Sequence, residues 1–197
     1  VNHYNRKYIA RLYDSGKLDQ SFNYTDTTPH VPTDLALQAD GKPVVTFTDN
    51  SAQDNLIARL NTDGSIDPTF AVEDRDDDYF YISLRDIAIQ ANGKIVVAGT
   101  VSSGIETVNA YCQRVNADGS TDATFQPAVT GTSINAISIQ SNGKIVLSGI
   151  YKNNYIEKPY SNNTITRLNV DGSKDLTFNN YSGVEGADPS TYARFSN

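Results

Sequence analysis

The chain has 197 residues, a net charge of −7 and a hydrophobic fraction of 38%, which suffices for one domain with its own core. The acidic balance argues against binding to nucleic acid or an anionic membrane surface, because phosphate recognition needs a basic face. No run of 18 apolar residues is present, so we expect no membrane insertion. The chain starts at Val1 and contains no methionine, which we interpret as a piece of a longer protein.

The first repeated element occurs four times along the chain, and its first copy has the sequence IARLYDSGKLDQSF. The copies start at Ile9, Ile57, Cys112 and Ile165. Each combines a short apolar segment, a turn with Gly, and a closing Phe, a pattern that predicts a β-hairpin. The first copy departs most, with Tyr13 where the others have Asn and Lys17 where they have Ser. Cys112 takes the place of Ile, so we expect a core hydrophobe there and not a nucleophile.

A second hairpin module alternates with the first, and its copies start at Leu35, Ile87 and Ile137. In the middle copy, IAIQ alternates apolar and polar residues, Asn92-Gly93 forms the turn, and IVVAG returns as a strand. The turns of both modules need glycine at positive φ. The turn glycines expected to be structural are Gly64, Gly93, Gly119, Gly143 and Gly172. Two hairpins make four antiparallel strands, which is one propeller blade.

An Arg and an Asp recur at fixed positions in every copy of the first module. A three-residue loop with Gly in the left-handed region places them directly opposite each other on the two strands. The pairs are Arg11–Asp19, Arg59–Asp67, Arg114–Asp122 and Arg167–Asp175. We predict cross-strand ion pairs that fix the hairpin register; the alternative is four equivalent ligand sites. We expect the closing Phe to pack between blades.

The combined pattern R-[LV]-N-x-D-G-S-x-D-x-T-F and I-x-[IL]-Q-x-[ND]-G-K-[IP]-V resembles the delta-60 repeat, a predicted β-propeller repeat of bacterial surface and secreted proteins. It covers nearly the whole chain apart from the loops and the residues after Phe178. The resemblance implies an all-β propeller and supplies no catalytic residues. Its implied location is extracellular or at a bacterial cell surface.

The units predict about three and a half four-stranded blades in one domain. The expected bounds are a half-blade over 1–30, blades over about 31–72, 73–127 and 128–180, and a tail over 181–197. Since a closed propeller usually has four to eight blades, we favour a sector of a larger propeller, completed by further repeats or another chain. A self-closed four-bladed propeller is the first alternative, and a linear stack of hairpins the second.

One insertion between modules is strongly acidic, with the sequence EDRDDDYFY from Glu73 to Tyr81. Its metal-ligand candidates are Asp74, Asp76, Asp77 and Asp78. Clustered carboxylates suit Ca²⁺, which takes several oxygen ligands, yet the spacing is not that of an EF-hand loop. A solvated acidic loop is the favoured interpretation, so no cofactor is expected and calcium stays the alternative.

Tyr- and Asn-rich insertions are the binding candidates, since tyrosine rings give rigid contact area and amides give hydrogen bonds. The residues are Tyr79, Tyr81, Tyr151, Asn154, Tyr155 and Tyr160. They suit a protein or a glycan partner. The alternative interpretation is that these aromatic residues pack on neighbouring blades.

No catalytic motif is present, and the two histidines, His3 and His30, lie outside the repeats. We therefore expect no enzymatic activity. The leading hypothesis is an extracellular or cell-surface scaffold that binds or adheres to a protein. A carbohydrate-binding module is the second hypothesis, and a hydrolase with its site on blades absent from this sequence is the third.

Overall fold

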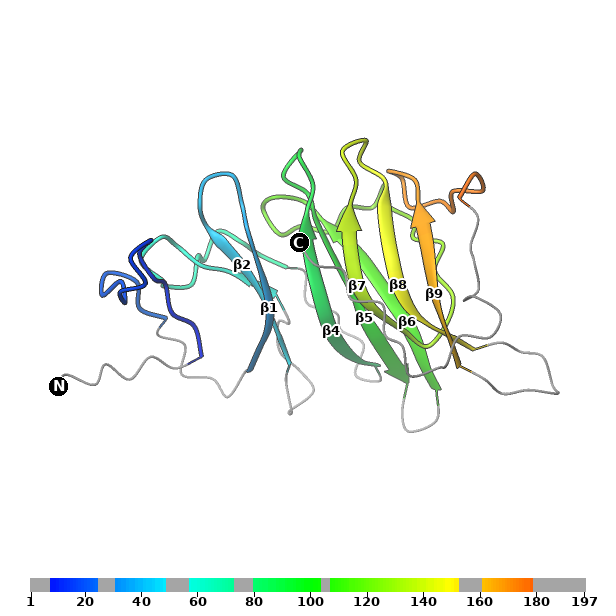
Figure 1. The fold of residues 1–197 in the computed structure, drawn as a ribbon, viewed down its shortest axis with the longest axis horizontal. Coiled ribbons are helices and arrows are strands. Elements are labelled where there is room, and N and C mark those ends of the chain that lie inside the picture. The colour runs from blue at the N-terminus through cyan, green and yellow to red at the C-terminus, as the bar shows by residue number, and fades with distance from the viewer. Residues whose placement is uncertain are drawn as a thin grey trace.

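The computed structural model describes residues 8–24, 31–48, 57–72, 80–103, 107–152 and 161–178. These residues form nine β-strands and no helix, arranged as three antiparallel sheets of three strands (Figure 1). The first sheet contains β1 (Val31–Leu37), β2 (Pro43–Thr48) and β3 (Ile57–Arg59). The second contains β4 (Phe80–Ile89), β5 (Ile95–Ser103) and β6 (Thr107–Val115). The third contains β7 (Ser133–Ile139), β8 (Ile145–Lys152) and β9 (Ser161–Leu168).

The turn of the first module has the predicted three-residue loop, and the turn of the second module has a loop of the same length. In the second module, the N–H of Gln90 donates to the carbonyl of Lys94 at 2.8 Å, and Gly93 has a φ of 83°. In the first module, the N–H of Asn61 donates to the carbonyl of Ser65 at 2.8 Å, with Gly at positive φ in the corresponding place. The divergent first copy keeps the same closure, from Tyr13 N–H to the Lys17 carbonyl at 2.9 Å.

The prediction of four strands in each blade is wrong, because each sheet of the described residues has three strands. After the turn of the first module the chain makes only one isolated bridge, for example Leu60 with Ile66. The next residue, Asp67, accepts hydrogen bonds from the N–H and the hydroxyl of Thr69, at 3.0 and 2.6 Å. This local side-chain turn competes with strand pairing, and it directs the chain away from the sheet towards the closing Phe.

The core lies between consecutive sheets. Phe70 is buried with Leu84, Ile95 and Val97 of the second sheet, and Phe125 is buried in the same way against the third. The closing Phe therefore packs between blades, as predicted. β1 lies beside β4, and β4 beside β7. Each blade thus buries its apolar face against the next one.

The three sheets do not close into a ring. The hairpin of residues 8–24 lies at one end of the long axis and β9 at the other (Figure 1). The all-β propeller fold is therefore present as an open row of three sheets preceded by one hairpin. In the described part of the chain, no helix has the length and apolar character needed to cross a membrane.

Candidate functional site

The sheets have two chemically different ends. At one end, which we call the turn end, lie the three-residue turns of both modules, in the upper part of Figure 1. At the opposite loop end, β1 starts beside the end of β2, β4 beside the end of β5, and β7 beside the end of β8. Segments of unequal length join or enter the strands at the loop end: 49–56, 73–79, 104–106 and 153–160. The turns, which have the same length in every repeat, therefore lie at the end of the sheets opposite to the connections of variable length.

Two of the predicted binding residues lie at the loop end. Tyr81 is the second residue of β4, pairs with Ser102 of β5, and is 57% exposed. Tyr151 is near the end of β8 and pairs with Asn162 of β9. The structure thus brings these two positions, from consecutive sheets, to the same end. The other candidates fall outside the described residues: Tyr79, Asn154, Tyr155, Tyr160, and the carboxylates Asp74, Asp76, Asp77 and Asp78.

At the turn end, all four expected Arg–Asp ion pairs are present. The distances from Arg Nε to Asp Oδ2 are 2.8 Å for Arg11–Asp19, 2.9 Å for Arg59–Asp67, 2.6 Å for Arg114–Asp122 and 2.7 Å for Arg167–Asp175. Each guanidinium also lies over the closing Phe of its own repeat, with centroid distances from 4.5 to 5.1 Å. Such cation–π contacts add to the ion pair.

A lysine completes the carboxylate site in three of the repeats. Its Nζ lies 2.7 Å from Oδ2 of the same Asp, in the pairs Lys42–Asp67, Lys94–Asp122 and Lys144–Asp175. The Lys hydrogen bond is the main reason that the pKa values of Asp67 and Asp175 lie well below the ordinary range. Sequence reasoning missed this cation, although the Lys after each Asn-Gly or Asp-Gly turn of the second module was a visible signal.

A second carboxylate arrangement links the first strands of consecutive sheets, β1 to β4 and β4 to β7. Asp34 of β1 accepts a hydrogen bond from the N–H of Ile87 at 3.2 Å, and Asp86 of β4 accepts one from the N–H of Ile137 at 2.5 Å. Both residues follow a β-bulge. Burial, together with the neighbouring Asp34, raises the pKa of Asp86 to about 7. Sequence reasoning missed these residues; the recurring Asp before the second module at 34 and 86 was the available signal.

These charged groups therefore connect parts of the fold. The turn-end carboxylates accept hydrogen bonds from the Arg of their own hairpin and, in three repeats, from the Lys of the preceding hairpin. Asp34 and Asp86 accept hydrogen bonds from backbone N–H groups of the next sheet. Cys112 is buried, and burial raises the pKa of its thiol to about 12, which disfavours the reactive thiolate. Among the residues that the structure describes, no cluster of three or more His, Cys, Asp or Glu side chains could hold a metal ion.

Comparison with solved structures gives distant similarities. A protein described as a provisional gluconolactonase is 17% identical, with a TM-score of 0.45, over 82% of this chain and 52% of that one. PorZ, an essential bacterial surface component of the type-IX secretion system of Porphyromonas gingivalis, is 13% identical, with a TM-score of 0.40, over 83% of this chain and 30% of PorZ. Our chain thus spans about half of the first protein and under a third of the second. Neither similarity carries an argument about function.

No curated protein sequence matches the chain. The model of a domain of unknown function, the DUF5122 β-propeller, matches residues 38–70, 90–125 and 140–178. Each match begins at the Gln before the turn of the second module and ends at the closing Phe of the first. Each match covers the second and third strands of one sheet and its turn-end ion pair, and together the matches cover more than half of the 197 residues. The chain therefore belongs to the DUF5122 β-propeller family.

Proposed function

We propose that this chain is a non-enzymatic β-propeller module that binds a protein partner through its loop end, at a bacterial cell surface. One observation carries the proposal. Between consecutive repeats, the turn end carries Arg hydrogen bonds that hold the repeats together, whereas the loop end carries connections of unequal length and the exposed ring of Tyr81. Rigid scaffolds commonly present their binding residues on such variable loops.

The state of the polar groups supports a binding role over a catalytic one. The carboxylates of Asp67, Asp122 and Asp175 each form ion pairs with one Arg and one Lys side chain, so they are not free to act as acid or base. The Asp34 and Asp86 carboxylates bind backbone N–H groups. The resemblance of the repeat to the delta-60 repeat of bacterial surface and secreted proteins supports the proposed location.

Site-specific photocrosslinking tests the proposal. A photoreactive phenylalanine analogue at Tyr81 samples the loop end, and the same group at Ala91, which is exposed in the turn between β4 and β5, samples the turn end. On cells of the producing organism, we expect a protein crosslink from position 81 that a Tyr79→Ser variant of the same chain weakens. No protein crosslink from position 81, or equal crosslinking from both positions, would refute the proposal.

A carbohydrate is the second candidate ligand, because the 57% exposed ring of Tyr81 offers an aromatic surface on which a sugar can stack. A glycan array separates the two. Binding to a defined glycan that Tyr81→Ser abolishes would favour the carbohydrate, and Lys17→Ser serves as the matched control at the turn end. A flat array together with a protein crosslink would favour the protein partner.

A further inference from the structure

Consecutive repeats dock through one recurring interface at the turn end. The Arg of each of the first three repeats donates from Nη1 to a backbone carbonyl in the turn of the following repeat. These bonds are Arg11 to Thr62 at 2.7 Å, Arg59 to Ala117 at 2.8 Å and Arg114 to Val170 at 2.5 Å. The N–H after the closing Phe donates to the next carbonyl of the same turn: Asn23 to Asp63, Ala71 to Asp118 and Gln126 to Asp171. We call the Arg and Phe side the donor face, and the turn with the apolar residue before it the acceptor face.

The acceptor face needs a glycine for close approach as well as for its φ. A Cβ at Gly64 would lie 2.7 Å from the backbone carbon of Asn23. The equivalent Cβ atoms of Gly119 and Gly172 would lie 3.0 and 2.8 Å from the backbone of Ala71 and Gln126. All three glycines are buried by the preceding repeat. Any side chain there would force the two repeats apart.

The first hairpin presents the same acceptor face uncovered. Its turn has the same hydrogen bonds, and Gly16 has a φ of 76°, but Gly16 is exposed, with none of the described residues within 4 Å of its Cβ position. Leu12 is 60% exposed, whereas the equivalent Leu60 and Leu168 are 0% exposed. An apolar side chain and a turn that are covered in the other repeats are therefore open to solvent here.

The last repeat presents the complementary donor face uncovered. Arg167 keeps its ion pair with Asp175, but in the described part of the chain its Nη1 donates to the Gln140 side chain at 3.4 Å and to no backbone carbonyl. Phe178 is only half-buried, while the closing Phe residues of the first three repeats are buried. The Arg167 guanidinium is thus held in the position from which the other Arg residues donate to a turn carbonyl, but no such carbonyl lies against it among the described residues.

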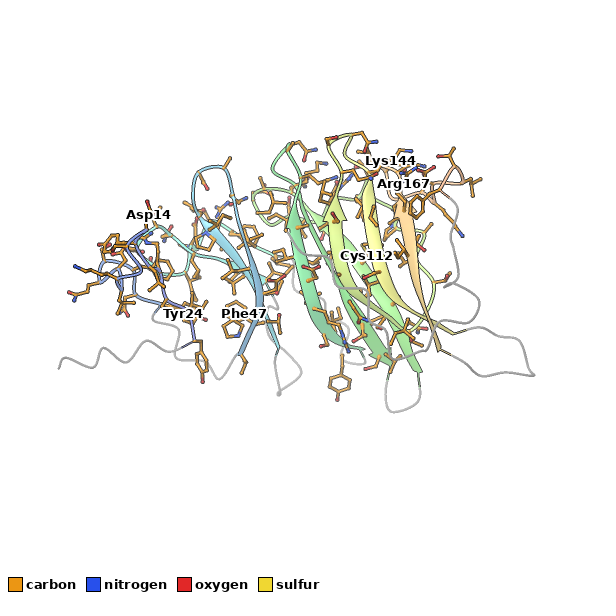
Figure 2. All side chains as sticks on the ribbon, in the orientation of Figure 1. Asp14, Tyr24, Phe47, Cys112, Lys144 and Arg167 are labelled. Carbon is orange, nitrogen blue, oxygen red and sulfur yellow. The ribbon has the colours of Figure 1, made fainter. Side chains whose placement is uncertain are left out.

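From these two open faces we infer that a second copy of this chain docks head-to-tail, with its first hairpin on the Arg167 and Phe178 face. The occupant follows from the three internal interfaces, since the first hairpin has the same turn geometry as the turns already docked. Asp14, in the acceptor turn, and Arg167 lie at opposite ends of the molecule (Figure 2). The two faces differ, so the contact is heterologous and forms rings or open rows of copies. It uses the turn end, so it is independent of the proposed loop-end function.

Sedimentation velocity over a series of protein concentrations tests the inference. We expect the wild-type chain to self-associate. Arg167→Lys removes the Nη1 donor and keeps the charge, and we expect it to weaken association about tenfold or more. Gly16→Asn adds a side chain to the acceptor turn, and Asn tolerates positive φ. Gly41→Asn is the matched control, because Gly41 has a φ of 82°, also has open space, and lies in a turn of the other module.

Mixing the variants separates docking from misfolding. Arg167→Lys keeps an intact acceptor face and Gly16→Asn an intact donor face, so an equal mixture is expected to form a heterodimer that neither variant forms alone. Leu12→Gln, at the exposed site, repeats the acceptor test without altering the turn. A wild-type chain that is monomeric at every concentration, or association that Arg167→Lys and Leu12→Gln leave unchanged, overturns the inference.

Discussion

Replacing Asp122 with Asn tests the role of the turn-end carboxylate in the repeat where its Arg partner is most buried. Asp122 accepts hydrogen bonds from Arg114 Nε at 2.6 Å, Lys94 Nζ at 2.7 Å, and the N–H and hydroxyl of Thr124 at 3.1 and 2.6 Å. An amide oxygen can keep the two bonds from Thr124. The amide nitrogen would then face two cationic donors, and Arg114, which is 4% exposed, would lose its counter-ion.

We expect this substitution to lower the free energy of unfolding by about 3 kcal/mol. Breaking a buried ion pair by removing one partner costs about 3–5 kcal/mol. The lower end applies because Arg114 retains its bond to the Val170 carbonyl and its contact with Phe125, and Lys94 reaches solvent. A loss of this size is a large part of the stability of about 5–15 kcal/mol that is usual for a domain.

Urea unfolding followed by tyrosine fluorescence measures the effect, since the chain has 12 Tyr and no Trp. The matched variant is Asp19→Asn, whose partner Arg11 is 41% exposed; we expect a clearly smaller loss there, with equal m-values in both. Burial alone raises the pKa of Asp122, but hydrogen bonds from Lys94, Thr124 and Arg114 outweigh it and hold the pKa below its ordinary value.

Because the folded-state pKa is depressed, the carboxylate stabilises the fold fully above about pH 4, the ordinary pKa of Asp, and this is lost as the pH falls through the folded-state pKa. The stabilities of wild type and Asp122→Asn should therefore converge in acid. Equal losses for Asp122→Asn and Asp19→Asn at pH 7 would contradict the reasoning from burial.

Three further predictions follow from the described contacts. Asp86 has a pKa raised to about 7, above its unfolded value of about 3.9, so the stability of the wild type should fall as pH rises from about 4 to 7. In melting experiments between pH 5 and 8, Asp86→Asn should reduce the dependence of the melting temperature on pH. Gly149→Ala places a Cβ 2.1 Å from the Ser133 carbonyl oxygen, so we expect a loss of about 1–3 kcal/mol in urea unfolding, with Ser148→Ala nearly unchanged. Lys94→Met leaves the Arg114 ion pair in place, so its loss should be about 1 kcal/mol; a loss as large as that of Asp122→Asn would contradict the two-cation description.

The sequence predicts the hairpins and their register because the signals for both are local. The turn around Gly64 and the facing of Leu60 and Ile66 depend only on residues within one module. The absence of a fourth strand was not predictable in this way, because the repeat pattern indicates Arg59 as the partner of Asp67 and gives no partner for the second carboxylate oxygen. That oxygen binds Thr69 and ends the strand.

Contacts between modules escaped the sequence for a different physical reason. Lys42 lies 25 positions from Asp67, and Asp34 lies 53 positions from the N–H of Ile87. Only the way the sheets stack brings such groups together. The binding candidates were found by composition alone, and the structure supplies the common end on which Tyr81 and Tyr151 lie.

The repeat pattern and the docking of repeats depend on the same side chains, which explains where the pattern breaks. Each internal Arg binds its Asp, covers its Phe and donates to the next turn, so a change there would damage both the hairpin and its neighbour. The first copy has no preceding repeat among the described residues, and there the pattern relaxes. Tyr13 replaces Asn, and its hydroxyl donates to Asp19 at 2.9 Å, a carboxylate that has no Lys partner in the described part of the chain. A departure that preserves the turn but leaves its outer face uncovered is what an exposed docking surface permits.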